Sequence, residues 1–153
     1  MATAPDLRLD IQYALPRRGL PKAGDFRRWA AAVPLDGPCE AALRIVDEDE
    51  GAELNRQWRG KPNATNVLSF PSDAPPSPRS SRRHLGDIVI CAPVVAREAM
   101  AQGKPEAAHW AHLLIHGLLH LQGYDHVTAK QAKIMEALET EILARLGYPD
   151  PYA

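Results

Sequence analysis

The chain has 153 residues, of which 45% are hydrophobic and 24% are charged, and its formal net charge is −1. These values are typical of one soluble globular domain over residues 1–153, and they exclude a protein that binds polyanions through overall charge alone. No apolar run approaches the length of about 18 residues that a membrane span needs, and the N-terminus lacks the features of a secretory signal. We therefore expect a cytoplasmic protein in which Cys39 and Cys91 remain reduced.

The first half of the chain predicts alternating strands and helices. Residues 7–14 alternate apolar and polar side chains, which is typical of a strand with one wet face. Asp47 or Asp49 is expected to cap a helix that carries acidic residues in its first turn, as the helix dipole prefers. The expected elements are a strand over 7–14, a helix over 22–33 that Pro34 ends, a strand over 42–46, a helix from 47 or 49 to about 58, and a strand over 66–70.

The second half predicts mostly helix. Residues 71–84 are rich in proline and serine without periodicity, which predicts a mobile loop. The expected elements are a strand over 87–91, helices that begin near Pro93 and Pro105, the second running to about 121, and a last helix capped by Thr128 and ended by Gly147 and Pro149. The apolar face of that last helix carries Ile134, Met135, Leu138, Ile142 and Leu146. Four strands and about five helices make an α+β or mixed α/β domain.

Four histidines fall on one face of the helix that is expected to end near residue 121. At about 100° per residue, they lie within a sector of roughly 80°. They are His109, His112, His116 and His120. The other faces of this helix are apolar almost all round, which predicts that the helix is buried. Because buried imidazoles need partners, this face is the first candidate for a functional site.

The spacing of three histidines predicts a metal site. His116 and His120 lie four residues apart, so two ring nitrogens can point at one position. Gly123 can adopt a positive φ and end the helix, after which the chain turns back and His126 supplies a third nitrogen. Three imidazoles with one open coordination position are typical of a catalytic zinc site. We expect one zinc ion on His116, His120 and His126, with nickel and copper as alternatives.

The neighbouring polar residues have less specific interpretations. His109 and His112 are expected to form hydrogen bonds near the site rather than to bind the metal. Asp125 either orients a histidine or caps a backbone turn. The last helix carries an acidic stretch of Glu136, Glu139 and Glu141.

The histidine and glycine intervals match the metzincin protease motif, His-Glu-x-x-His-x-x-Gly-x-x-His, with one difference. Gly117 replaces the glutamate that serves as the protease's general base. A phosphodiester suits such a site better than an amide, because its leaving alkoxide needs charge stabilisation that a metal and an arginine supply. Arg59, between a predicted helix and a predicted strand, is the candidate arginine, and a surface or structural role is the alternative.

Basic residues cluster in three segments of the chain. Such clusters bind phosphates if the fold brings them to one face, and otherwise they form an ordinary solvated surface. The clusters are Arg17, Arg18, Lys22, Arg27 and Arg28; Arg56, Arg59 and Lys61; and Arg79, Arg82 and Arg83.

Several segments resemble the YbeY family of bacterial single-strand-specific endoribonucleases. They are the motif His116-Gly-Leu-Leu-His-Leu-Gln-Gly-Tyr-Asp-His126, the segments Leu54-Asn-Arg-Gln-Trp-Arg-Gly-Lys61 and Thr65-Asn-Val-Leu-Ser-Phe-Pro71, Leu85-Gly-Asp-Ile-Val-Ile-Cys91, and residues 135–143. The resemblance implies a small mixed sheet flanked by helices. It also implies a metal, most often zinc, that His116, His120 and His126 bind in a cleft beside that sheet.

The resemblance further implies a reaction and its setting. It gives Arg59 a catalytic or RNA-binding role and places His116 in the catalytic group. It implies cytoplasmic action on ribosomal RNA precursors, notably at the 3′ end of the small-subunit RNA, and in ribosome quality control, with the ribosome or ribosome-associated proteins as partners. The chain departs from the family pattern at Pro62 and Ala64, where members usually have Asp and Pro, in the loop that follows Arg59.

The favoured function is a metal-dependent endoribonuclease of single-stranded RNA. Two alternatives stay open. One is a metalloprotease that takes its base from elsewhere, for instance Asp125, and the other is a ribosome-assembly or RNA-binding factor whose metal is structural. The sequence does not distinguish water from the ribose 2′-hydroxyl as the nucleophile.

Overall fold

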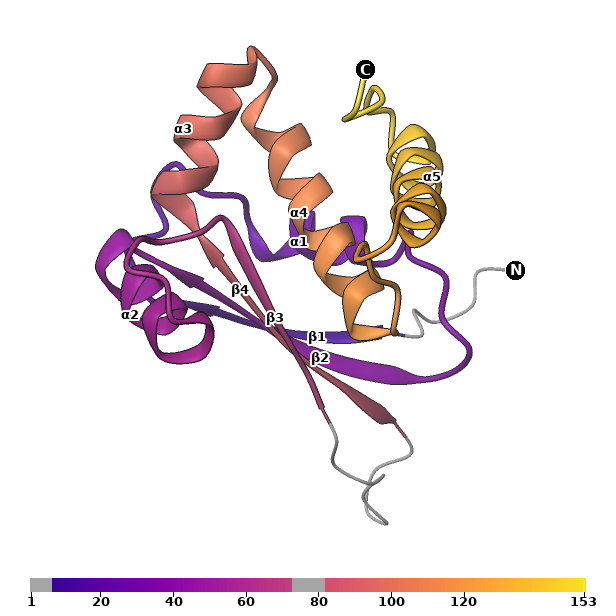
Figure 1. Ribbon diagram of the computed structural model, residues 1–153, viewed down its shortest axis with the longest axis horizontal. Helices are drawn as coiled ribbons and strands as arrows, with labels where there is room; N and C mark the ends of the chain where they lie inside the picture. Colours follow the sequence, from indigo (N-terminus) through magenta and orange to yellow (C-terminus); the bar gives the residue numbers. More distant parts are fainter. Residues whose placement is uncertain (1–6, 73–81) are drawn as a thin grey trace.

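The computed structural model describes residues 7–72 and 82–153, and this part of the chain forms four strands and five helices (Figure 1). The elements are, in chain order, β1 (Leu7–Tyr13), α1 (Ala23–Ala30), β2 (Cys39–Val46), α2 (Glu48–Arg59), β3 (Val67–Pro71), β4 (Arg83–Cys91), α3 (Ala92–Gln102), α4 (Glu106–Leu121) and α5 (Ala129–Arg145). The predicted mixed α/β class is confirmed.

The four strands form one mixed sheet in the order β1-β2-β4-β3. β1 pairs with β2 and β2 pairs with β4 in parallel, whereas β3 pairs with β4 in the antiparallel direction. The central strand β4 is buried on both faces near its end, because Ile88 and Ile90 join the main core while Val89 and Cys91 join a smaller cluster on the opposite face. This explains why residues 88–91 of β4 are continuously apolar rather than alternating.

Helices cover the two faces of the sheet unequally (Figure 1). The helix α4 contacts β3, β4, α1, α3 and α5, and it therefore lies at the centre of the main core. Aromatic rings join α1 to α4: the Phe26 ring meets Trp29 at 5.5 Å and Trp110 at 5.6 Å between centroids, in edge-to-face geometry. On the other face, α2 covers the smaller cluster, which includes Val46, Leu68 and Val89. The position of α4 is thus fixed from several sides.

Local sequence signals set the helix boundaries. Asp47 accepts a hydrogen bond from the backbone N–H of Glu50 at 2.9 Å, and Thr128 accepts one from the backbone N–H of Gln131 at 3.1 Å. Both predicted caps are confirmed. The first helix, α1, ends at Ala30, before the predicted boundary at 33, because residues 31–33 form a turn.

Two sequence predictions are corrected. β4 begins at Arg83, so the predicted loop over 71–84 is shorter, and residues 73–81 of it lie outside the described residues. Ile134 is 48% exposed, whereas Met135 is 1% exposed. The reason is that α5 buries the stripe through Met135 and Ile142, and Ile134 lies about 100° away from Met135 around the helix.

The remaining general predictions concern thiols and membrane spans. Cys39 and Cys91 are both buried, and no disulfide joins them. Among the helices that the structure describes, none combines the length and the apolar character that crossing a membrane requires.

Gly117 permits the close approach of α4 to β4. A Cβ atom at this position would lie 3.0 Å from Ile88 Cδ1 and 3.1 Å from Ile88 Cγ2, which is tighter than ordinary van der Waals contact. A larger side chain would therefore push the helix away from the strand. This packing explains why a glycine follows His116, and it leaves no room for the glutamate of the metzincin motif.

We expect Gly117→Glu to lower the free energy of unfolding by at least about 3 kcal/mol, because the new side chain is overpacked and its carboxylate is buried without a partner. Gly117→Ala is the matched control and should stay within about 1 kcal/mol of wild type, since the helix propensity of alanine offsets a small steric strain. Urea unfolding followed by circular dichroism measures both variants. Equal stability of the two variants would contradict this account of the position.

Candidate functional site

One cleft collects the candidate residues. It has a volume of about 550 Å³ and lies between the end of α2, the strand β3 and the end of α4. Its lining includes Arg59, His116, His120 and His126, together with Asp125. Residues that are 67 positions apart in the chain thus meet in one hollow, as the sequence predicted for a site that combines a histidine cluster with Arg59.

The end of α4 brings the three histidines together. His116 and His120 occupy the last two turns of α4, which ends at Leu121. Gly123 has a φ of 101°, and the backbone N–H of Tyr124 then donates to the carbonyl of Leu119 at 3.2 Å, so the chain folds back on the helix end. The ring centroids lie 5.5 Å apart for His116 and His126, 6.3 Å for His120 and His126, and 6.5 Å for His116 and His120.

In His116 and His120, the hydrogen bond made by Nδ1 determines which ring nitrogen carries the proton. His120 Nδ1 lies 3.0 Å from the carbonyl oxygen of Tyr124, and His116 Nδ1 lies 2.6 Å from Oε1 of Glu139. A carbonyl or carboxylate oxygen only accepts hydrogen bonds, so each Nδ1 carries the proton. Each Nε2 of the neutral ring is left with a lone pair, which is the form that binds a metal ion or accepts a proton.

The third histidine is held less tightly. The side chain of His126 is 58% exposed, and its Nδ1 lies 3.8 Å from Oδ1 of Asp125. The same Asp125 oxygen accepts the backbone N–H of His126 at 2.7 Å. Of the two roles expected for Asp125, the structure therefore supports the backbone turn. As the side chains stand, no set of three or more His, Cys, Asp or Glu in the described ranges forms a group ready to hold a metal ion.

A buried carboxylate supports the histidine face of α4. The side chain of Glu139, on α5, is 0% exposed. It accepts hydrogen bonds from His116 Nδ1 at 2.6 Å, from His112 Nε2 at 3.0 Å and from the hydroxyl of Tyr152. Burial alone would raise the pKa of Glu139, but these three donors outweigh it and lower the pKa to about 2. Glu139 is therefore ionised, and it orients His116 toward the cleft.

Sequence reasoning missed this role of Glu139. The sequence groups Glu139 with Glu136 and Glu141 in an acidic stretch, although Glu139 lies four residues after Met135 and three before Ile142. Those two neighbours are buried, so helical spacing places Glu139 on the buried stripe of α5. A buried carboxylate needs a cation or a hydrogen-bond donor as its partner, and the histidines of α4 provide such donors.

The other two histidines of α4 form hydrogen bonds, as predicted. His109 is 4% exposed, and its Nε2 lies 2.8 Å from Oε1 of Glu98, which also accepts from Asn66 Nδ2 at 3.0 Å. Burial lowers the pKa of His109, and the hydrogen bond to Glu98 opposes this shift without reversing it. Because Asn66 lines the cleft, this network ties the wall of the cleft to α4.

Arg59 is the last residue of α2, and Gly60 caps the helix with a φ of 67°. Arg56, one turn earlier, forms an ion pair with Glu53 at 2.5 Å. Among the described residues no hydrogen bond or ion pair engages the Arg59 guanidinium, which is exposed at the cleft. The family departure at Pro62 and Ala64 has not removed it from the cleft.

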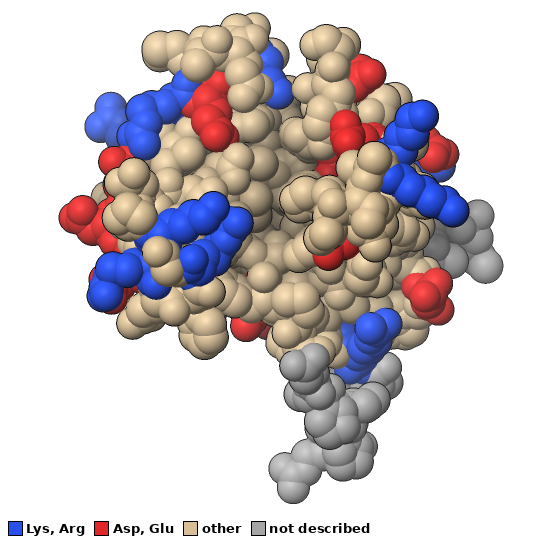
Figure 2. Space-filling model, in the orientation of Figure 1, with Lys and Arg blue, Asp and Glu red and all other residues tan. Residues whose placement is uncertain are grey.

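The space-filling view shows Lys and Arg side chains gathered over α2, beside a hollow in the middle of this face (Figure 2). The exposed basic residues of this segment are Arg56, Arg59 and Lys61, the second cluster that the sequence predicted. Of the described residues that line the cleft, Arg59 is the one Arg or Lys, and Asp125 is the one carboxylate. The cleft lining therefore combines one positive charge, on Arg59, with one negative charge, on Asp125.

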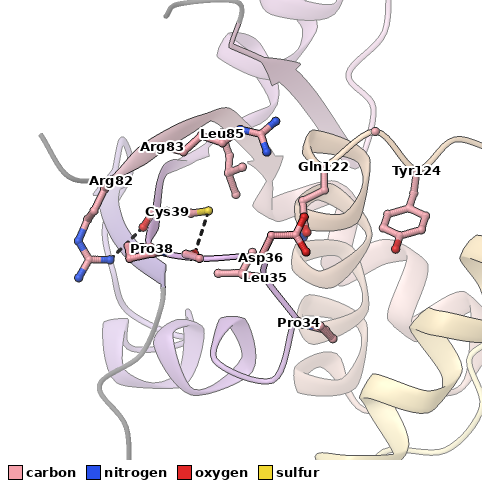
Figure 3. A pocket seen from close by; sticks show the side chains of 12 residues that line it. Pro34, Leu35, Asp36, Pro38, Cys39, Arg82, Arg83, Leu85, Gln122 and Tyr124 are labelled. Atoms are coloured by element: carbon pink, nitrogen blue, oxygen red, sulfur yellow. Dashed lines mark hydrogen bonds between the residues drawn. The ribbon is translucent and has the colours of Figure 1, made fainter. Parts of the chain in front are cut away.

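A second cleft, of about 600 Å³, lies on the other side of the turn at 122–124 (Figure 3). Arg82 points away from it, and its guanidinium donates to the carbonyl of Cys39 at 3.1 Å. Asp36 and Gln122 point toward each other in the lining of this cleft. The three candidate histidines and Arg59 line the first cleft and not this one, so the first cleft is the candidate site. Arg79, from the same basic cluster as Arg82, lies outside the described residues.

Comparison with known proteins identifies the relationship. The family model described as "Endoribonuclease YbeY" matches residues 26–147, which include every residue of the cleft. The chain belongs to the YbeY family. Among curated members, "Endoribonuclease YbeY" of Alkalilimnicola ehrlichii is 54% identical over 97% of this chain and 93% of its own length. The proteins of the same name from Xanthomonas axonopodis pv. citri and Stenotrophomonas maltophilia are 57% and 58% identical, over 96% of this chain and 95% of their own lengths.

A solved structure shares the fold. The solution structure of a Thermotoga maritima protein superposes with a TM-score of 0.58 and covers 94% of this chain and 98% of that protein. Its sequence is 23% identical, so the match concerns the fold alone.

We expect Glu139→Gln to lower the free energy of unfolding by about 2–3 kcal/mol at neutral pH, because a buried network loses a charged acceptor of three hydrogen bonds. The folded pKa of about 2 lies below the ordinary value of 4.5, so the stabilisation is present above about pH 4.5 and disappears as the pH falls towards 2. The difference in the free energy of unfolding between wild type and Glu139→Gln should therefore become smaller at acidic pH. Urea unfolding at a series of pH values measures it.

The control for this experiment is Glu141→Gln. Glu141 lies on the same helix, and its side chain is 58% exposed and paired with Arg145. Its substitution should change stability by less than about 0.5 kcal/mol. If the free energies of unfolding of wild type and Glu139→Gln differ by the same amount from neutral to acidic pH, Glu139 does not carry the assigned charge.

Proposed function

We propose that this chain is a metal-dependent endoribonuclease that cleaves single-stranded RNA in the maturation of ribosomal RNA. The family match over residues 26–147 and the identities of 54–58% support the endoribonuclease activity. The observation that carries the assignment to a site is the meeting of Arg59 with His116, His120 and His126 in one cleft. The ribosomal RNA precursors, the ribosome-associated partners and the cytoplasmic location follow from the family resemblance.

The donor set fits a metal ion. Two imidazoles on one tetrahedral zinc ion, with Zn–N bonds of about 2.0–2.1 Å, have ring centres about 5 Å apart. The three rings here are 5.5–6.5 Å apart, so modest side-chain rotations bring their Nε2 atoms to one position. The Nδ1 protons of His116 and His120 are already committed to fixed acceptors, which favours ligation through Nε2. Zinc is the expected ion, and nickel and copper accept the same ligands.

When bound, such an ion polarises a phosphate oxygen and lowers the pKa of a water molecule. The residues of the chain have separate tasks. His116, His120 and His126 are the residues that would hold the ion. Arg59 offers a planar, permanently charged group that binds two phosphate oxygens and neutralises the charge that develops on them. Glu139 and the carbonyl of Tyr124 keep two of the rings in orientation.

The competing functions have weaker support. A metalloprotease needs a carboxylate base near the ion, but Gly117 has no room for one and Asp125 is engaged by the backbone N–H of His126. A purely structural metal would not account for an exposed arginine, unpaired within the described ranges, at the same cleft. An anionic substrate accounts for the histidine cluster and for the exposed arginine in the same cleft.

We expect Arg59→Ala to fold normally and to lower kcat/KM for cleavage of single-stranded RNA by at least about 100-fold, because the charge that stabilises the reacting phosphate is lost. Arg56→Ala is the matched control, since Arg56 is exposed on the same helix but is paired with Glu53. It should retain activity within about threefold. Full activity of Arg59→Ala, measured on a labelled oligoribonucleotide, would refute the role of this arginine.

We expect one zinc ion per chain in the purified protein, and we expect His120→Ala to lose it, because two imidazoles bind an ion much more weakly than three. His84→Ala is the control, since His84 is exposed on β4 and does not line the cleft. Elemental analysis and competition with a chelator measure the metal, and a casein assay tests the protease alternative. Stoichiometric zinc in His120→Ala would show that the ion binds elsewhere.

A further inference from the structure

Trp58 is exposed in a way that folding does not explain. Its side chain is 66% exposed, whereas the other two tryptophans, Trp29 and Trp110, are each 1% exposed. Apolar surface of this size is unfavourable in water, and exposed aromatic side chains beside a cleft often contact a ligand. The exposure of Trp58 therefore indicates that its side chain contacts a ligand.

The Trp58 ring is held in place without being covered. It meets the Phe70 ring at 5.5 Å between centroids, with an angle of 66° between the planes. Phe70 lies on β3, in the sheet, so it gives the exposed indole a rigid support. An edge contact of this kind fixes an aromatic ring while much of its surface stays in solvent.

Trp58 also lies next to the candidate site. It precedes Arg59 in α2, and both residues line the same cleft as His116, His120 and His126. Trp58 and Phe70 also line a neighbouring groove of about 620 Å³, where the one described arginine, Arg44, is paired with Glu50 at 2.6 Å. The aromatic pair thus borders both hollows. Arg59, the next residue after Trp58, has no ion-pair partner within the described ranges and lines the same cleft.

We propose that Trp58, supported by Phe70, is a stacking platform for one unpaired nucleobase of the RNA, while Arg59 holds an adjacent phosphate. This inference rests on the proposed function and explains how the site selects single-stranded RNA. Every base has a π-face, so the contact tolerates sequence. In a duplex both faces of a base are covered by its neighbours, and the platform therefore selects single strands.

Intrinsic fluorescence tests the stacking directly. Because the other two tryptophans are buried, Trp58 should dominate any change in emission that RNA causes. We expect a single-stranded oligouridylate, added to metal-free protein, to quench the emission, and we expect a duplex of equal length to quench it far less. Trp58→Phe should lose the quenching but should bind the labelled oligonucleotide within about threefold of wild type, because a phenyl ring also stacks.

Trp58→Leu separates stacking from packing. Leucine retains apolar contact with Phe70 but offers no ring to a base, so we expect binding about 5- to 100-fold weaker than wild type. In the metal-loaded protein the loss should appear as a raised KM with kcat little changed, because binding and not chemistry is affected. Met100→Ala, which alters a side chain that is 86% exposed outside the cleft, is the control.

The outcomes are distinct. Weak binding by Trp58→Leu together with near-normal binding by Trp58→Phe, at unchanged melting temperature, supports the platform. Unchanged binding and KM in Trp58→Leu overturn it and leave a protein partner as the use of this surface. Equal losses in both variants, with a lowered melting temperature, also overturn it in favour of a structural role. If wild type binds and is quenched but cleaves no RNA, the endoribonuclease proposal fails and the platform stands.

Discussion

A single buried carboxylate organises the functional end of this molecule. Glu139 has no contact with solvent, and it accepts hydrogen bonds from His112, His116 and Tyr152. A charge in such a position is stable only while its donors remain in place, so the carboxylate and the imidazoles hold one another. The contact also joins α5 to α4. The orientation of His116 is therefore a property of the helix pair rather than of one side chain.

Much of the fold could be predicted from the sequence, because its signals are local. The alternation in β1, the caps at Asp47 and Thr128, and the apolar circumference of α4 all act within a few residues. The convergence of His116, His120 and His126 was predictable for the same reason, since a helix period and one glycine determine it. The metal itself stays a prediction, because it depends on a ligand and not on the backbone.

The roles of Glu139 and Trp58 could not be predicted in the same way. Glu139 is 23 residues from His116 and 27 from His112, so only the packing of α5 on α4 reveals the network. Tryptophan side chains are usually largely buried, and helical spacing alone does not tell which side of α2 faces solvent. Arg59 was a candidate because it lies between a predicted helix and a predicted strand, and the family resemblance strengthened that prediction. Its place in the cleft depends on how β3 and α2 meet.

The hydrogen bond from Tyr152 has a practical consequence for handling the protein. Tyr152 is the last residue but one of the sequence, and its hydroxyl donates to the carboxylate that orients His116. A change at Tyr152 therefore acts on His116 through Glu139, although Tyr152 does not line the cleft. The segment that carries Tyr152 belongs to the support of the candidate site and should be left unaltered when the protein is engineered for purification.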